Sequence, residues 1–227
     1  MNGKLNENNI YRMILNYIDF YEIKRDNMTF YKRRERFSGF SEILGRAFAK
    51  VGLSPNQWTM ISLIPVLIAF YPLLNGQFII AGLLFILSSF LDMVDGAVAR
   101  HLGKATKHGA YLDTVVDRYV EVIIILGIML AGLPGFLLPS SVWIVLYLFG
   151  ALMTTYVKAA AKEKELIGQG KELKGGLLER AERLLILFLG LILAGIDPIC
   201  LTYVIAVLGI LTNISALQRI GIALKMN

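Results

Sequence analysis

Long apolar runs separated by short polar connections make up most of the sequence after about residue 53. Six of these runs have the length of about 17–25 residues that is typical of transmembrane helices,. They cover roughly 55–74, 78–100, 110–133, 141–161, 177–194 and 198–218. The second and third runs are apolar only if their aspartates are set aside, and the fifth carries Arg180 and Arg183 near its start. The pattern predicts an all-α, polytopic membrane protein with six transmembrane helices.

A shorter amphipathic stretch, residues 37–52, precedes the first apolar run. Glu42, Arg46 and Lys50 fall on one helical face of this stretch, because residues four apart lie above one another on a helix,. The opposite face is apolar and consists of Phe40, Ile43, Leu44, Ala47, Phe48 and Val51. Helices with one apolar and one charged face lie in the plane of the membrane surface. We therefore expect an interfacial amphipathic helix before the transmembrane region.

These patterns divide the chain into four parts. Residues 1–36 are polar and aromatic with mixed charges, and form a cytoplasmic N-terminal extension. The interfacial helix follows at 37–52, and the six-helix transmembrane domain occupies 53–220. A short cytoplasmic tail, 221–227, ends the chain.

Composition supports the membrane assignment. Hydrophobic residues make up 56% of the 227 residues, and the mean hydropathy is +0.61. An ordinary soluble domain is about 45–50% apolar, so the excess indicates contact with lipid. The single cysteine, Cys200, excludes a disulfide within the chain and is expected to be an apolar packing residue,.

The distribution of basic residues predicts the orientation in the membrane. The formal net charge is +6, which alone would suit a nucleic-acid partner. Lys and Arg, however, gather before the first run, around the second and fourth connections, and at the C-terminus, and the other three connections contain none. Basic residues accumulate on the cytoplasmic side of membrane proteins. We therefore expect no nucleic-acid partner, a cell-membrane location, and both termini in the cytoplasm.

Four aspartates interrupt the second and third runs. Asp92 and Asp95 are three residues apart near the end of the second run, and Asp113 and Asp117 are four apart near the start of the third. Such spacings place each pair on one helix face. The short connection at 101–108 makes the two helices antiparallel neighbours, so two acidic stripes are predicted to face each other near the cytoplasmic surface.

Four carboxylates in membrane helices are energetically unfavourable unless other groups neutralise or solvate their charges. Each costs about 2.5–3.5 kcal/mol at a helix centre on insertion scales. Hydration or pairing with Arg100 and Arg118 would account for one or two of them, but not for four in helical register. Carboxylate oxygens are the ligands that Mg²⁺ and Mn²⁺ prefer, and two such ions about 3.5–4 Å apart form the usual clamp for phosphoryl displacement. The aspartates are therefore predicted to bind two divalent cations, Mg²⁺ or Mn²⁺.

Small residues and an arginine accompany the aspartates. Gly96 and Gly109 lack side chains, so a ligand can approach the backbone closely,. Ala99 shares the helical face of Asp92 and Asp95. Arg100 at the membrane edge can bind a phosphate with two hydrogen bonds. Together with metal ions, these residues favour a diphosphate-bearing ligand at the cytoplasmic interface.

The complete pattern resembles the signature of the CDP-alcohol phosphotransferases. It reads D-x-x-D-G-x-x-A-R over 92–100, followed after eight residues by G-x-x-x-D-x-x-x-D over 109–117. The six runs and the preceding amphipathic stretch also resemble this family, over roughly 38–220. The resemblance implies an enzyme of phospholipid biosynthesis that transfers a phosphatidyl-type group from a CDP-linked lipid to a polar alcohol and releases CMP. It also implies a homodimer.

The resemblance further implies roles for individual residues. Asp92, Asp95, Asp113 and Asp117 would bind the two metal ions, Asp113 and Asp117 would be catalytic, and Asp117 is the candidate general base. The CDP-donor site would consist of Asn56, Asp95, Gly96, Ala99, Arg100 and Gly109.

Two basic segments indicate the acceptor. The segments TTYVKAAAKE and GGLLERAERLL resemble those of the branch that uses inositol phosphate, and imply an acceptor site of Thr155, Lys158, Arg180 and Arg183. Inositol 1-phosphate is therefore the expected acceptor. Glycerol 3-phosphate, as used by phosphatidylglycerolphosphate synthases, remains an alternative. So does a soluble CDP-inositol donor, as used in the synthesis of di-inositol-phosphate phosphate.

A divalent-cation transporter is an alternative from another functional class, because acidic residues within membrane spans mark ion paths. Transporter sites, however, usually lie near the bilayer midplane, on broken helices within internal repeats. Here the acids lie toward the predicted cytoplasmic ends, and no repeat is visible in the sequence. The sequence therefore favours the transferase.

Overall fold

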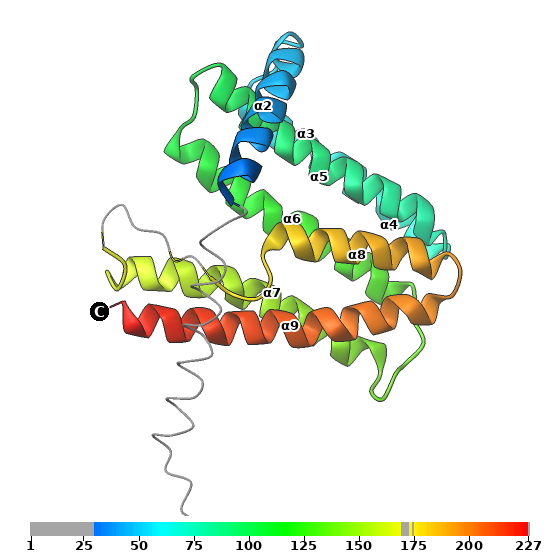
Figure 1. The fold of residues 1–227 in the computed structure, drawn as a ribbon. Helices are drawn as coiled ribbons and strands as arrows, with labels where there is room; N and C mark the ends of the chain where they lie inside the picture. Colours follow the sequence, from blue (N-terminus) through cyan, green and yellow to red (C-terminus); the bar gives the residue numbers. More distant parts are fainter. Residues whose placement is uncertain (1–29, 169–172, 174, 227) are drawn as a thin grey trace, which may run out of the picture.

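The computed structural model describes residues 30–168, 173 and 175–226, and every regular element in these ranges is an α-helix. In chain order (Figure 1) the helices are α2 (Phe30–Ala49), α3 (Pro55–Ile61), α4 (Leu63–Leu74), α5 (Phe78–His101), α6 (Lys107–Leu130), α7 (Ser140–Glu163), α8 (Arg180–Ala194) and α9 (Pro198–Lys225). An isolated β-bridge joins Phe136 to Leu138 in the connection before α7. The predicted all-α class is confirmed for this part of the chain.

Four segments in the described ranges are long and apolar enough to cross a membrane. They are the α3–α4 pair taken together as Pro55–Leu74, and the helices α5, α7 and α9. Helix α6 has 24 residues but carries five charged residues between Lys107 and Glu121, and α8 has 15 residues. The membrane character of the chain is confirmed, and the count of six spans remains a prediction.

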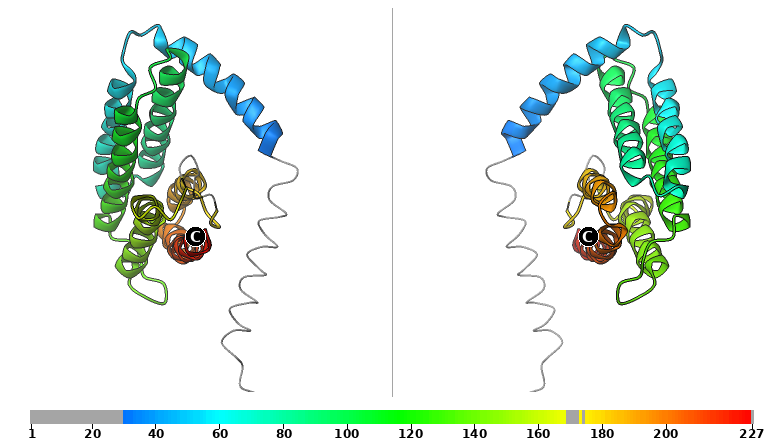
Figure 2. Two further views of the ribbon diagram at one scale, coloured as in Figure 1. Left: turned by 90° about the vertical axis from the view of Figure 1, so that its left-hand side faces the viewer. Right: turned by 90° about the vertical axis from the view of Figure 1, so that its right-hand side faces the viewer.

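Helix α2 is longer than the predicted interfacial helix. It begins at Phe30, seven residues before the predicted start at 37, whereas residues 1–29 of the expected extension lie outside the described residues. The helix packs on α5, and its N-terminal half extends away from the bundle (Figure 2). Leu44 is buried at this contact, but the side chain of Ile43 is 68% exposed. The apolar face of α2 is therefore covered only in part by protein.

The remaining helices form one core. Helix α4 packs on α5 and α6, α8 packs on α5 and α9, and α7 lies along α9 (Figure 1). Apolar side chains at the centre of this core are fully buried, among them Val66, Phe85, Ile124 and Leu187. In a water-soluble protein, burial of each such side chain contributes roughly 1.5–3 kcal/mol to the stability of the fold. Between helices in a membrane, close van der Waals packing is the main stabilising contribution of these side chains.

Helix alternation brings several helix ends to one side of the bundle. The last turns of α5, α7 and α9 and the first turn of α6 lie at the left of Figure 1, and the shorter α8 begins nearer the middle of that view. The connections 75–77 and 195–197 lie at the other side, because they link the opposite ends of these helices. The four aspartates therefore share one end of the bundle with Lys158 on α7 and with Arg180 on α8.

Candidate active site

Three aspartates converge between α5 and α6. One carboxylate oxygen each from Asp92, Asp95 and Asp113 lies within 4.8 Å of the other two. Asp92 and Asp95 come from the last ten residues of α5, and Asp113 from the second turn of α6. The prediction that the two acidic stripes face each other is thereby confirmed for three of the four carboxylates.

The start of α6 is fixed by a cap. Thr106 has extended backbone angles, and its hydroxyl accepts a hydrogen bond from the amide of Gly109 at 3.0 Å. Such a cap satisfies one of the amides that a helix leaves without an internal partner. Helix α6 begins at Lys107. Asp113 and Asp117 follow on it one turn apart, on the side of the helix that faces α5.

Asp117 joins the cluster through an arginine. The Nη2 atom of Arg180 lies 2.5 Å from Oδ1 of Asp117, and its Nη1 atom donates a hydrogen bond of 3.2 Å to Oδ2 of Asp92. A single guanidinium from α8 therefore bridges carboxylates from α5 and α6. Arg180, which the sequence assigned to the acceptor, lies directly beside the predicted metal ligands.

Thr59 is a site residue that sequence reasoning missed. Its hydroxyl donates a hydrogen bond to Oδ2 of Asp95, and its side chain is buried. Thr59 lies three residues after Asn56 on α3, which places the two side chains on neighbouring parts of one helix face. This spacing is the one signal in the sequence that connects Thr59 with the predicted site.

The predicted donor residues divide into two groups. Asn56 and Gly109 lie next to each other, since a Cβ atom added to Gly109 would be 3.2 Å from Oδ1 of Asn56. On α5, a Cβ atom at Gly96 would be 3.2 Å from Nη1 of Arg100. The guanidinium of Arg100 also donates a hydrogen bond of 2.8 Å to the hydroxyl of Ser41 on α2. Ser41 was not predicted.

Ala99, the remaining donor-site prediction, is half-buried on α5, four residues after Asp95. Gly96 and Ala99 lie on the same face of α5. Both have small side chains or none, and the guanidinium of Arg100 lies over this face at Gly96.

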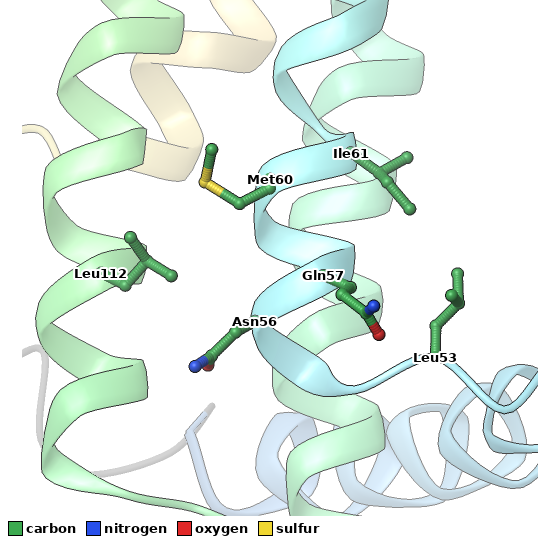
Figure 3. A pocket seen from close by; sticks show the side chains of 6 residues that line it. All are labelled: Leu53, Asn56, Gln57, Met60, Ile61 and Leu112. Atoms are coloured by element: carbon green, nitrogen blue, oxygen red, sulfur yellow. The ribbon is translucent and has the colours of Figure 1, made fainter.

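A pocket of about 440 Å³ lies beside this region, between α3 and α6. Its lining consists of Leu53, Asn56, Gln57, Met60, Ile61 and Leu112. Asn56 and Met60 extend from α3 toward the helix that carries Leu112 (Figure 3). Apart from two amides the lining is apolar, and the pocket includes none of the four aspartates.

The predicted acceptor residues lie at different depths. Thr155 is half-buried and Lys158 is exposed, both in the last three turns of α7. Arg180 is partly covered at the aspartates, whereas Arg183 is 1% exposed. The guanidinium of Arg183 donates hydrogen bonds to Glu121 and Thr154. Arg183 is thus enclosed by protein groups, in contrast to Lys158.

Glu121 and Tyr147 are two more residues that sequence reasoning left without a role. Glu121 is buried on α6, and its carboxylate accepts hydrogen bonds from the Tyr147 hydroxyl at 2.7 Å and from Nη1 of Arg118 at 2.8 Å. The signal for Glu121 was its position four residues after Asp117, which extends the acidic stripe of α6 by one turn.

The three converging carboxylates fit a metal ion. Carboxylates this close repel each other by about 3.5 kcal/mol per pair at an effective dielectric constant of about 20. The Oδ1 atom of Asp92 is buried and has no hydrogen-bond partner among the described residues. A hard divalent cation neutralises such a cluster and takes up such an oxygen. The donor set, made of oxygen atoms alone, is suited to Mg²⁺ or Mn²⁺.

Comparison with known proteins agrees with the site. The family model for CDP-alcohol phosphatidyltransferases matches residues 53–216. The archaetidylinositol phosphate synthase of Pyrococcus horikoshii is 34% identical over 187 residues, which cover 82% of this chain and 93% of that protein. The phosphatidylinositol phosphate synthase of Mycobacteroides abscessus is 31% identical over 164 residues, which cover 71% of this chain and 72% of that protein.

A solved structure shares the fold. It is the phosphatidylinositol phosphate synthase of Mycobacterium tuberculosis in complex with manganese and citrate, which matches with a TM-score of 0.70 at 24% identity. The match covers 81% of this chain and 88% of that one. The same protein with CDP-DAG bound matches with a TM-score of 0.69 at 24% identity, and covers 81% of this chain and 92% of that one.

Proposed function

The chain belongs to the CDP-alcohol phosphatidyltransferase family, and we propose that it transfers a phosphatidyl-type group from a CDP-linked lipid to inositol 1-phosphate, with release of CMP. The observation that carries this proposal is the convergence of Asp92, Asp95 and Asp113 within 4.8 Å, beside the guanidinium of Arg180. Carboxylates for metal ions and a cation for phosphate are the two requirements of phosphoryl transfer to a phosphorylated alcohol.

Two divalent cations complete the proposed site, held by Asp92, Asp95, Asp113 and Asp117. When bound, such ions stabilise negative charge on the attacked phosphoryl group and on the leaving nucleotide. The M. tuberculosis relative, which was solved with manganese, supports a metal of this kind. Thr59 orients the Asp95 carboxylate through its hydrogen bond.

The donor is proposed to bind along the face of α5 and α6 that has small side chains. Asn56 and Gly109 are proposed to receive the nucleotide, and Gly96 and Ala99 to let the diphosphate approach the helix backbone. Arg100 is proposed to contact the diphosphate, while its hydrogen bond to the hydroxyl of Ser41 keeps the guanidinium in place at the end of α5. The relative that was solved with CDP-DAG bound supports a lipid donor.

In the proposed reaction, the acceptor hydroxyl attacks the β-phosphorus of the donor, which carries the lipid. The new bond joins the acceptor oxygen to this phosphorus, while the bond to the oxygen that bridges the two phosphates breaks. CMP leaves with that oxygen, and Asp117 takes the proton of the attacking hydroxyl. Asp113 and Asp92 would hold the metal ions at the reacting end of the site from the two facing helices.

The acceptor is proposed to be inositol 1-phosphate. Lys158, Arg180 and the hydroxyl of Thr155 are the groups that we assign to it, because they lie at the aspartate end of α7 and α8. Two cations suit an acceptor that carries a phosphate of its own. The names of the relatives, an archaetidylinositol phosphate synthase and a phosphatidylinositol phosphate synthase, support this choice over glycerol 3-phosphate. Arg183 is not assigned to the acceptor, because the protein groups of Glu121 and Thr154 enclose its guanidinium.

We also propose the arrangement in the membrane. Six spans, with α3–α4 as the first and the shorter α8 as the fifth, place both termini and the aspartates at the cytoplasmic surface. Helix α2 lies along that surface, where its exposed apolar residues such as Ile43 contact lipid. A homodimer is expected from the family. The transporter alternative is set aside, because the family is one of transferases.

The proposal is tested by measuring CMP release from the purified protein in liposomes. The assay contains Mg²⁺ or Mn²⁺ and a CDP-linked lipid, either diacyl or ether-linked. Inositol 1-phosphate, inositol, glycerol 3-phosphate and serine are added separately, and EDTA serves as the metal control. We expect metal-dependent release with inositol 1-phosphate that exceeds release with the other alcohols.

Different results separate the parts of the proposal. Release with glycerol 3-phosphate alone would overturn the acceptor assignment but keep the reaction. Release only when CDP-inositol replaces the CDP-linked lipid would overturn the lipid donor. Full activity in excess EDTA would overturn the metal assignment.

A further inference from the structure

A second polar layer lies one helical turn below the aspartates. Glu121 follows Asp117 by four residues on α6, and Arg183 follows Arg180 by three residues on α8. At these spacings each pair lies on one face of its helix. The ion pair between Arg180 and Asp117 is therefore repeated deeper in the bundle by the ion pair between Arg183 and Glu121, at 3.2 Å.

The Glu121 carboxylate is satisfied on every side by protein groups. Arg183 donates to both of its oxygens, at 3.2 and 3.3 Å through Nη2. The Tyr147 hydroxyl donates to Oε1 at 2.7 Å, and Nη1 of Arg118 donates to Oε2 at 2.8 Å. Glu121 is 1% exposed. This carboxylate therefore links α6, α7 and α8 at a single point.

The same layer reaches α9 and the segment before α8. The Nη1 atom of Arg183 donates a hydrogen bond of 3.1 Å to the hydroxyl of Thr154. The carbonyl of Thr154 accepts a hydrogen bond of 2.7 Å from Nη1 of Arg219, and Nε of Arg219 donates to the carbonyl of Gly175 at 2.9 Å. Gly175 precedes α8 by five residues, so the layer holds the start of that helix as well.

Stability alone is a weak reason for such a layer. Removing two ions from water costs several kcal/mol each, and replacing a buried pair with apolar side chains is often neutral or stabilising. Breaking one partner is costly, because the other charge is left buried. A buried pair does fix the rotation and height of the helices that carry it, since its hydrogen bonds are satisfied in only one register.

We propose that Glu121 and Arg183 are positioning residues, which fix the register of α8 against α6 so that Arg180 meets Asp117 and Asp92 at the site. This inference rests on the proposed function, and it reassigns Arg183 from the acceptor to the framework. A rotation or a slip of α8 at Arg183 is transmitted over one turn to Arg180. A displacement of about 1 Å in a reacting group can cost about 100-fold in rate.

The first test is the Glu121→Gln variant, which keeps the shape of the side chain but removes its charge. We expect a decrease in kcat of about 100-fold at saturating donor and acceptor, with Mn²⁺ affinity, measured by electron paramagnetic resonance, close to that of the unaltered protein. Arg183→Lys should lower kcat in the same way, because a single ammonium cannot make the four hydrogen bonds that the guanidinium donates to Glu121 and Thr154. Glu163→Gln, an exposed change at the end of α7, is the control.

A double variant distinguishes positioning from acceptor binding. If Arg183 and Glu121 act as a pair, Glu121→Gln combined with Arg183→Gln should lower kcat no further than either change alone. If Arg183 binds the acceptor directly, Arg183→Lys should raise the acceptor KM with an unchanged kcat, and Glu121→Gln should have little effect. That second pattern would overturn the inference.

A distance measurement tests the inference without turnover. In a Cys200→Ser background, spin labels at Tyr119→Cys on α6 and Leu185→Cys on α8 report on the two helices, since both positions are exposed. Glu121→Gln should shift or broaden the distance distribution, and Glu163→Gln should not. An unchanged distribution with an unchanged kcat would overturn the inference and leave the proposed function intact. Absence of turnover in the unaltered protein would instead count against the proposed function.

A milder variant covers the case in which Glu121→Gln does not fold. Tyr147→Phe removes one hydrogen bond to the carboxylate and leaves both charges in place. The loss of one hydrogen bond to a charged group corresponds to about a tenfold change in a rate or equilibrium constant. We expect kcat to fall by about that factor while the KM for the acceptor stays the same. An unchanged kcat in a folded Tyr147→Phe variant would overturn the inference.

Discussion

The hydroxyl of Thr59 donates a hydrogen bond to Oδ2 of Asp95, and so connects the first apolar segment to the aspartate cluster. Thr59 is 3% exposed, and the bond spans α3 and α5. Groups that hydrogen-bond to a metal ligand fix its orientation and affect metal affinity almost as much as the ligands themselves. Thr59 is therefore expected to support the Asp95 carboxylate in the proposed metal site.

Replacing Thr59 with Val should weaken metal binding, because Val keeps the shape of the side chain but cannot donate to Asp95. We expect Mn²⁺ affinity to fall by about tenfold, measured by electron paramagnetic resonance on the purified protein. Thr59→Ser, which retains the hydroxyl, is the matched control and should bind Mn²⁺ nearly as well as the unaltered protein. Equal affinity in the Val and Ser variants would refute a role for this bond.

The Asp113→Asn variant tests the metal ligands directly. An amide keeps the size of the carboxylate but removes its charge, so the site loses one anionic ligand. We expect CMP release to fall by about 100-fold or more, with little change in the thermal unfolding temperature, because relief of repulsion among the carboxylates offsets the lost ligand. Near-normal turnover in a folded variant would contradict the assignment of Asp113 to the metal site.

Features that repeat along the sequence were predictable. The apolar runs identified the helices of the structure, and the spacing of Asp92, Asp95 and Asp113 was enough to place them on facing stripes. Both follow from helix periodicity, which is local. The predicted starts fall within three residues of those of α5, α6 and α9, where capping residues such as Thr106 and a proline at the first helical position give the start of the helix. The predicted end at 218 is seven residues before the end of α9.

Contacts between helices far apart in the sequence were not predictable. Thr59 and Asp95 are 36 residues apart, and no local pattern pairs a hydroxyl on one helix with a carboxylate on another. Arg180 and Arg183 lie on the same helix three residues apart, and their sequence context looks alike. The different roles proposed for them follow from depth, since the first lies at the aspartates and the second lies one turn deeper in the bundle. Depth depends on how α8 packs, which is a tertiary property.

Lys158 offers a test of the acceptor site on α7. If Lys158 binds the acceptor phosphate, Lys158→Met should raise the KM for inositol 1-phosphate by roughly 10- to 150-fold, because a charged hydrogen bond is worth about 1.5–3 kcal/mol. The KM for the donor should change much less. Lys162→Met, an exposed change one turn further along α7, is the control for the loss of one positive charge. Equal effects of the two variants would indicate general electrostatic attraction in place of a specific contact.

The close packing of α2 on α5 provides the last prediction. Gly45 lies against α5, where an added Cβ would be 2.5 Å from the carbonyl oxygen of Ala97 and 2.7 Å from Cβ of His101. Real side chains do not approach backbone atoms this closely, so Gly45→Ala must push α2 away from α5. Ser41 precedes Gly45 by one turn and would then lose its contact with Arg100, which is 2.8 Å long.

We expect Gly45→Ala to raise the KM for the CDP-linked donor by several-fold, roughly the effect of 1 kcal/mol, with a smaller change in the KM for the acceptor. Gly39→Ala is a matched control on the same helix, because a Cβ at Gly39 would meet no atom within 4 Å. Alanine favours helices over glycine by about 1 kcal/mol, so the control should be neutral or slightly stabilising. If both variants had the same donor KM, α2 would act only as a membrane anchor, and Arg100 would reach the diphosphate without help from Ser41.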